Sequence, residues 1–469
     1  MSAASSMPTY APFRRYASYV ERIRSLMTAP LSTANWQSQT DAALDGEAST
    51  QLRALTGKAT RRKFGAFFTG SALSQRLLAR SRVSEGLAYD PTCGMGDLLV
   101  AAARRLPLGK TLIETLDQWG GRLAGTDLHD EFITGTKTRL VLLAQRRHGI
   151  EEATPVLNLD DLFPHVRVAD GLAVNQEFNA AKRLLMNPPF GQMRATSGCE
   201  WADGKVSRAA EFVIHALENV QEGTELLAIL PDVLRSGSFS THWRDRVSQL
   251  AEVHCVRTCG LFDESTDVDV FLLHLVRRKK AEAKLLKKWP QRRRTQAARL
   301  ADYFEVSVGR VVPHRDTETG PLYPYIHPRG VPAWETMRYF PEHRRYSAHP
   351  FRAPFVVIRR TSRPEHPHRA TGSIIGGNDL ISVENHFIVC TPKDGTLRSC
   401  RRLLQELQKA RVNHSLNQRI RCRHLTVGAV ADIPHRPRLI TDDMYALRAA
   451  AVAGLGITFY YMVTTQPWL

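Results

Sequence analysis

The chain has 469 residues, of which 43% are apolar, and it carries a formal net charge of +18 with a pI of about 9.9. This length fits two or three domains with a sizeable core, and the charge favours a polyanionic partner, nucleic acid before a membrane. The seven cysteines are scattered and Cys255 and Cys259 lack a second pair at zinc-ligand spacing, so reduced thiols are expected rather than a disulfide framework.

The first 60 residues are predicted to form a short helical segment. The apolar residues Tyr19, Ile23 and Leu26 recur there at helical spacing among polar residues. The segment resembles a transit peptide only faintly, and no secretory signal is recognised in it. We therefore expect a cytoplasmic protein of a bacterium or an archaeon.

Residues 61–280 are predicted to form a doubly wound α/β domain. Short apolar runs that end in small or acidic residues alternate with amphipathic stretches; the runs include 86–90, 122–127, 183–187 and 226–230. Strands and helices in turn are typical of a mostly parallel sheet with helices on both faces. In such sheets ligands bind beyond the carboxyl ends of the strands.

A basic stretch, residues 277–294, contains one acid and marks a boundary. It is either a solvated linker or a segment that contacts phosphates, and both interpretations place a linker at 281–300. Residues 301–469 are predicted to form an α+β domain with strands starting at Phe355 and His386 and a helix over 399–409. The longest apolar run, 449–463, falls short of the roughly 18 residues that suggest a membrane span, so no membrane partner is expected.

The sequence Asn187-Pro188-Pro189-Phe190 follows an apolar run. Proline fixes φ and has no backbone donor, which leaves carbonyl oxygens free to point into a cavity as acceptors. The asparagine side chain adds another acceptor, and the phenylalanine supplies a flat apolar wall. This arrangement suits an amine with two N–H groups on a ring, such as the exocyclic amino group of a base. A proline-rich turn after a strand is the alternative.

A second pattern runs from Asp90 through Thr92, Gly94 and Gly96 to Asp97, between an expected strand and an expected helix. The two glycines allow a tight turn and a close approach of a ligand. The pattern lacks the Lys-Ser/Thr ending of a P-loop, so a nucleoside triphosphate is not expected. An ordinary strand-to-helix turn is the alternative.

Two further acids follow expected strands. Asp127 ends one strand, where a carboxylate can accept hydrogen bonds from both hydroxyls of a ribose. Asp170 follows another strand and can accept from the amino group of a cofactor's adenine. Singly, each acid is more often a turn residue, and it is their order and shared position that indicate a site.

Taken in this order, the patterns resemble the N6-adenine DNA methyltransferase family with the motif order called gamma. The resemblance covers about residues 60–280. It implies a Rossmann-like methyltransferase sheet, S-adenosylmethionine as cofactor, and methyl transfer to the N6 amino group of an adenine. Because the sulfonium is already an activated methyl donor, no metal is expected.

The resemblance also implies which residues contact the cofactor. Residues 63–70 stand for the family's opening motif, and Gly70 replaces a proline often found there. The implied cofactor-binding residues are Phe67 and Thr69 at the methionine end, Asp90, Thr92, Gly94 and Gly96 in the turn, Asp127 at the ribose, and Asp170 at the adenine.

The catalytic residues implied by the resemblance are Asn187, Pro188, Pro189 and Phe190. The Asn187 side-chain oxygen and the Pro188 carbonyl would hold the two amino protons and aim the nitrogen lone pair at the methyl group. The base must leave the duplex to reach them, and Phe190 would stack on it. Phe212 resembles an aromatic residue that lines the same base pocket.

Residues beyond 300 resemble, more loosely, the target recognition domain of restriction–modification adenine methylases. Arg359, Arg360 and Ser362 are the candidate DNA contacts. Double-stranded DNA is therefore the expected partner, and a separate restriction nuclease or other defence-system subunits stay open as further partners.

Other classes share part of the pattern. RNA amino-methyltransferases and protein-glutamine methyltransferases also carry Asn-Pro-Pro-aromatic, but the long basic C-terminal region favours duplex DNA. A non-catalytic DNA-binding protein is disfavoured by the complete motif set. A fused restriction enzyme is disfavoured because only about 60 residues precede the methylase region, too few for a nuclease module.

Overall fold

The computed structural model describes residues 13–29, 34–82, 85–149, 158–173, 176–195, 199–202, 204–262, 268–278, 289 and 298–435. The chain divides into two compact units. The first, here called the N-terminal unit, comprises Met1–Arg294 with Asn417–Thr426, and the second, the C-terminal unit, comprises Thr295–Leu416 with Val427–Leu469. Most of the predicted basic linker and the apolar run 449–463 lie outside the described residues.

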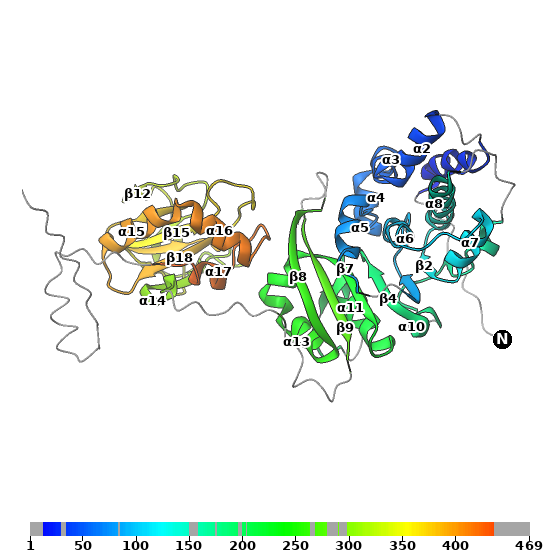
Figure 1. Ribbon diagram of the computed structural model, residues 1–469. Helices are drawn as coiled ribbons and strands as arrows, with labels where there is room; N and C mark the ends of the chain where they lie inside the picture. Colours follow the sequence, from blue (N-terminus) through cyan, green and yellow to red (C-terminus); the bar gives the residue numbers. More distant parts are fainter. Residues whose placement is uncertain are drawn as a thin grey trace, which may run out of the picture. The chain divides into compact units, whose positions relative to one another are not determined.

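The predicted N-terminal helical segment is confirmed as a group of short helices. They are η1 (Arg14–Tyr16), α1 (Ala17–Ser25), η2 (Leu26–Thr28), α2 (Ala34–Leu44), α3 (Glu47–Leu55) and α4 (Lys58–Phe64). Tyr19 and Ile23, spaced one turn apart, are buried on α1. Helices α1 and α2 pack against the long helix α8 (Asp130–His148), as Figure 1 shows. The segment is thus part of the core rather than an appendage.

A buried ion pair joins these helices to the central domain. The Arg139 guanidinium on α8 lies 2.9 Å from the Asp97 carboxylate, and its Nε donates to the Ala43 carbonyl over 2.8 Å. Arg139 also donates to the Met95 carbonyl. One side chain therefore fixes the N-terminal helices, α8 and the turn that follows the first strand.

The central sheet has seven strands in the order β3-β2-β1-β4-β7-β9-β8. Their bounds are β1 (Leu87–Asp90), β2 (Leu123–Asp127), β3 (Val166–Val168), β4 (Ala181–Met186), β7 (Glu225–Pro231), β8 (Ala251–Leu261) and β9 (Asp269–Arg277). The pairs from β3 through β7 are parallel, and β9 runs antiparallel to both β7 and β8. The predicted doubly wound α/β sheet is confirmed.

Helices cover both faces of this sheet. They are α5 (Ser71–Leu78), α6 (Asp97–Ala103), α7 (Leu112–Gly120), α8, α9 (Leu159–Leu162), α10 (Gln176–Ala180), α11 (Arg208–Asn219), α12 (Asp232–Ser236), η3 (Ser238–Ser240) and α13 (Thr241–Leu250). Successive strand residues point to opposite faces. On β7, Leu227 and Ile229 join the core with α5, α6 and α8, whereas Leu226 and Ala228 join the core with α11 and α13. A small hairpin, β5 (Gln192–Arg194) and β6 (Lys205–Ser207), precedes α11.

The C-terminal unit contains two sheets, and the predicted α+β class is confirmed. One sheet has the order β10-β18-β15-β16-β12 and the other β13-β11-β17-β14. The bounds are α14 (Leu300–Tyr303), β10 (Phe304–Val308), β11 (Leu322–Ile326), β12 (Thr336–Met337), β13 (His343–Arg345), β14 (Phe351–Arg352), β15 (Phe355–Arg359), β16 (Gly372–Ile375), β17 (Leu380–Val383), β18 (Phe387–Pro392), α15 (Leu397–Leu407), α16 (Ala410–Arg419) and α17 (Val427–Ala431). The two expected strands and the helix over 399–409 correspond to β15, β18 and α15. Among the described residues, no helix is both long and apolar enough to cross a membrane.

Candidate functional site

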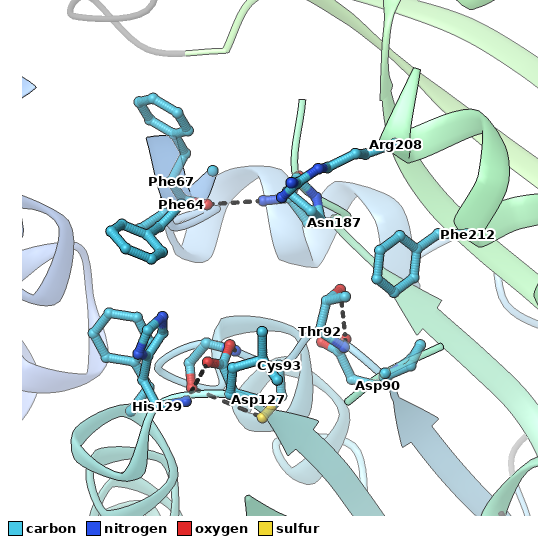
Figure 2. A pocket seen from close by; sticks show the side chains of 18 of the residues that line it. Phe64, Phe67, Asp90, Thr92, Cys93, Asp127, His129, Asn187, Arg208 and Phe212 are labelled. Atoms are coloured by element: carbon cyan, nitrogen blue, oxygen red, sulfur yellow. Dashed lines mark hydrogen bonds between the residues drawn. The ribbon is translucent and has the colours of Figure 1, made fainter. Parts of the chain in front are cut away.

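A cavity of about 310 Å³ opens at the carboxyl ends of β1, β2 and β4 (Figure 2). It brings together most of the residues that the sequence analysis selected. Those that line it are Phe67, Thr69, Asp90, Thr92, Gly94, Asp127, Asp170, Asn187, Pro189 and Phe212. Segments more than 100 residues apart therefore form one site, and its volume falls within the range of small-molecule sites.

The glycine turn after β1 shapes the floor of the cavity. Gly94 and Gly96 have φ values of +52° and +77°, in the left-handed region that favours glycine. The Gly94 N–H donates to the Asp127 Oδ2 over 3.1 Å, so the turn and the end of β2 are held together. A Cβ on Gly96 would lie 2.6 Å from the Thr136 side chain on α8. Gly96 thus lies outside the cavity lining, against α8.

Asp90 and Asp127 are carboxylates at the ends of β1 and β2; Asp90 is buried and Asp127 is half-buried. Burial raises the pKa of Asp90 to about 8, although the Thr92 N–H donates to it over 2.9 Å. Burial also raises the pKa of Asp127 to about 6, opposed by hydrogen bonds from the His129 and Gly94 N–H groups. Within the described chain neither acid forms an ion pair. A ligand that brings hydroxyl donors or a positive charge would relieve this cost.

Asp170 follows β3 and is exposed, and its Oδ1 accepts from the Leu172 N–H over 3.0 Å. The Phe212 ring on α11 stands beside it: its Cε1 lies 3.2 Å from the position that a Cβ would take on Gly171. An acceptor and an aromatic ring therefore border the same part of the cavity. This pairing can hold a flat heterocycle that carries an amino group.

Asn187 follows β4 and its side-chain amide has a defined orientation. The Nδ2 donates to the Phe67 carbonyl over 3.1 Å and to the Thr69 Oγ1 over 3.0 Å. Because the Phe67 carbonyl can only accept, the NH₂ group must face it. The Oδ1 therefore remains as an acceptor in the cavity. Phe67 and Thr69 position Asn187 as well as lining the cavity.

Pro189 packs closely against the opening motif. A Cβ on Gly65 would lie 2.3 Å from the Pro189 Cβ, so only glycine fits at position 65. Pro188 is buried and Phe190 is half-buried, and neither is among the residues that line the cavity. The Phe190 ring packs edge-on against Phe262, with centroids 5.5 Å apart. Its ring stands next to the cavity rather than inside it.

Several lining residues were not selected from the sequence. His129 stands among Phe13, Phe64 and Phe132, with ring centroids 4.6, 5.7 and 5.3 Å away, and burial lowers its pKa. Its position two residues after Asp127 was the signal available in the sequence. Arg208, one helical turn before Phe212, also lines the cavity, as does Met193 on β5.

Arg359, Arg360 and Ser362 lie in the C-terminal unit, at and after the end of β15. The Arg359 Nη2 donates to the Val331 carbonyl over 3.0 Å, and the Arg360 Nη1 donates to the Asn385 carbonyl over 3.4 Å. The Ser362 Oγ accepts from the buried Arg369 Nε over 3.5 Å. All three side chains are therefore already engaged within the unit. In the described part of the chain, no group of three or more His, Cys, Asp or Glu could hold a metal ion.

The sequence model of the N-6 DNA methylase family matches residues 51–289, slightly more than half of the chain. The chain belongs to this family. The cofactor of this family is S-adenosylmethionine. Membership favours the DNA methylase over the RNA and glutamine alternatives. No curated protein sequence matches the methylase.

Several solved structures resemble the methylase at low identity. A modification subunit attributed to a type I restriction enzyme of Vibrio vulnificus is 17% identical over 49% of each chain, with a TM-score of 0.36, so the methylase spans about half of that subunit's length. The M protein of the type I restriction enzyme EcoKI is 19% identical over 59% of each chain, with a TM-score of 0.33. A protein assigned as a class I S-adenosylmethionine-dependent methyltransferase of Listeria monocytogenes is 13% identical over 60% of the methylase and 91% of its own chain, with a TM-score of 0.34.

Proposed function

We propose that the protein is a site-specific DNA methyltransferase that methylates the N6 amino group of an adenine swung out of the duplex. The observation that supports this most directly is the orientation of Asn187. Its Nδ2 is held by Phe67 and Thr69, and its Oδ1 is left as an acceptor in a cavity that also contains the carboxylates of Asp90 and Asp127. This is the arrangement needed to present an amine to a cationic donor.

The ends of β1, β2 and β3 would hold the cofactor, which supplies an activated methyl group on its sulfonium. Asp127 would accept from the ribose hydroxyls, and Asp170 from the adenine amino group. The resemblance assigned Phe212 to the base pocket, but its ring stands beside Gly171, so we propose that it borders the cofactor's adenine instead. Asp90 and Asp127 fit such a ligand because each lacks an ion-pair partner among the described residues and gains from donors or positive charge. Gly94 fixes Asp127, so the acceptor is in place before binding.

Asn187 and the loop that follows it would hold the base. The Asn187 Oδ1 and the Pro188 carbonyl would accept the two N6 protons and direct the nitrogen lone pair toward the methyl group. Pro189, packed against Gly65, fixes the loop, and Phe190 would stack on the extruded ring after leaving its contact with Phe262.

The rest of the chain would select the DNA. The net charge of +18 favours binding to the phosphate backbone, and Arg359, Arg360 and Ser362 of the C-terminal unit are proposed contacts. We divide the chain into a helical segment (1–60), a catalytic domain (61–280), a linker (281–300) and a recognition domain (301–469). Because two of the resembling proteins are modification subunits of restriction enzymes, we propose a cytoplasmic restriction–modification or defence context. A separate restriction nuclease and other defence-system subunits are the two classes of further partner that this context offers.

Long-read sequencing of DNA from cells that express the chain tests this proposal. We expect modified adenine in one sequence context, and none in cells that express Asn187→Ala to the same level. Equal adenine signals in both cultures, or no modified adenine with the intact chain, would refute the proposal. The recognised sequence then supplies a defined duplex for work with the purified protein.

A further inference from the structure

Arg208 is a half-buried residue at the start of α11, and the site described above gives it no role. It lines the same cavity as Asn187 and Phe212. Among the described residues that line this cavity, no other is lysine or arginine. A permanent positive charge therefore faces a site whose other charged groups are carboxylates.

Arg208 lies along the loop that holds Asn187. Its backbone N–H donates to the Gly191 carbonyl over 2.9 Å. Its side-chain Cδ and Nε lie 3.5 and 3.8 Å from the position that a Cβ would take on Gly191. Figure 2 shows the side chain extending from α11 toward Asn187. Arg208 thus borders the part of the cavity proposed for the base. Asp90 and Asp127, at the ends of β1 and β2, border the part proposed for the cofactor.

The N–H donors of the Arg208 guanidinium are not used by other described residues. In the described part of the chain, it takes part in no ion pair and donates no side-chain hydrogen bond. Asp97, the lining acid with a cationic partner, is already paired with Arg139 at 2.9 Å. A guanidinium offers five N–H donors in a planar fork that matches two oxygens of a phosphate or carboxylate.

We propose that Arg208 binds a phosphate of the extruded nucleotide, an inference that rests on the proposed function. A base edge is neutral and would leave the charge uncompensated. The cofactor carries a carboxylate, but its own ammonium group lies beside that carboxylate and its net charge is positive. Its methionine end is assigned to Phe67 and Thr69, and its ribose and adenine to the ends of β2 and β3. The nucleotide brings a negative charge directly to the Asn187 side of the cavity, where Arg208 stands.

Arg208 is thus a positioning residue. Two donors on one phosphate fix the extruded nucleotide, so that its amino group meets the Asn187 Oδ1 in one orientation. Losing this contact is expected to weaken binding of the target duplex by about tenfold to a hundredfold, the range for a hydrogen bond to a charged group. The slope of log affinity against log salt is expected to fall by about 0.9, the value for one phosphate contact on duplex DNA.

The test uses the full chain and a duplex that carries the sequence found by long-read sequencing. A methylphosphonate, which is neutral, replaces the phosphate on the 5′ or the 3′ side of the target adenine. One of the two replacements is expected to weaken binding to the intact chain. Neither is expected to weaken binding to Arg208→Ala further, because the partner is already gone. Arg208→Lys keeps the positive charge but not the planar set of donors. Its affinity for the unmodified duplex should lie between those of the intact chain and Arg208→Ala.

Arg146→Ala is the matched control. Arg146 lies at the far end of α8, about 25 Å along the helix from His129, and its partner is the exposed Asp41 at 2.9 Å. This variant removes one positive charge and should bind the duplex and the methylphosphonates as the intact chain does. Melting temperatures of all variants confirm folding.

Equal sensitivity of the intact chain and Arg208→Ala to both methylphosphonates would overturn the proposal. A loss of cofactor affinity without a loss of duplex affinity would instead assign Arg208 to the cofactor's carboxylate. Failure of the proposed function is visible earlier, as the absence of modified adenine in cells, and then both proposals fall.

Discussion

The affinity for S-adenosylmethionine is expected to fall in mild acid because of Asp127. Burial raises the pKa of this carboxyl to about 6, and the ionised form is the one that accepts from two ribose hydroxyls. A ligand that prefers the ionised acid binds more weakly as the pH falls through that pKa. Both carboxylate oxygens already accept from N–H groups, at 3.0 and 3.1 Å, so the acceptor is held in place and only its protonation changes.

The size of the effect follows from the pKa. At pH 5 roughly a tenth of Asp127 is ionised, whereas at pH 7.5 nearly all of it is, so affinity should fall about tenfold between these values. Asp127→Asn should bind the cofactor more weakly at pH 7.5 by about 1.5–3 kcal/mol, the range for a hydrogen bond to a charged group. Asp127→Asn should lack the roughly tenfold fall in affinity that the intact chain shows between pH 7.5 and pH 5.

Isothermal titration calorimetry across this pH range measures both quantities. The ratio of the affinities of the two chains cancels the ionisation of the cofactor itself, and Asp117→Asn, at an exposed position on α7, serves as the control. A ratio that stays constant from pH 7.5 to pH 5 would refute the assignment of Asp127 to the ribose. It would leave the fold and the family unaffected.

Three other predictions follow from the site. Asn187→Ala should lower the methyl-transfer rate by about 10²–10³ while calorimetry still detects cofactor binding, and a loss below about tenfold would remove Asn187 from catalysis. Asp90→Asn should raise the melting temperature of the cofactor-free chain at pH 8 and above, because burial raises the pKa of Asp90 to about 8. The folded chain loses stability as the pH rises from about 4, the ordinary pKa of an aspartate, to about 8, and this loss is then complete. An unchanged or lower melting temperature would contradict this. Arg139→Met should lower the free energy of unfolding by about 3–5 kcal/mol in urea titrations, because Asp97 would remain as a buried charge without an ion-pair partner. A loss under about 1 kcal/mol would show that Asp97 is not left as an unpaired charge.

The parts of the fold that depend on local pattern could be predicted from the sequence. The apolar runs that end in Asp90 and Asp127 became β1 and β2, and the strand before Asn187 became β4, because short apolar runs with small or acidic ends specify buried parallel strands. Since these strands share one direction, their carboxyl ends meet, and most of the selected residues came together in one cavity. The order of motifs along the chain was enough to place them.

Contacts across long stretches of sequence could not be predicted. The orientation of the Asn187 amide depends on Phe67, 120 residues earlier, and the place of the Phe190 ring depends on Phe262. Gly96 was expected at the cofactor but packs on Thr136 of α8. In the C-terminal unit, parallel pairs such as β11 with β17 join strands far apart in the chain, and no local pattern specifies such a register.

The central claim is that the Asn187 acceptor holds an adenine amino group for methylation. The most direct measurement incubates the purified chain with cofactor labelled in its methyl group and with duplex DNA, then digests the DNA to nucleosides and separates them. The structure predicts that the label elutes as N6-methyl-2′-deoxyadenosine and that Asn187→Ala incorporates it about 10²–10³ times more slowly. Label in another nucleoside, in RNA or in protein glutamine, or an incorporation rate that falls less than about tenfold on loss of Asn187, would contradict the account.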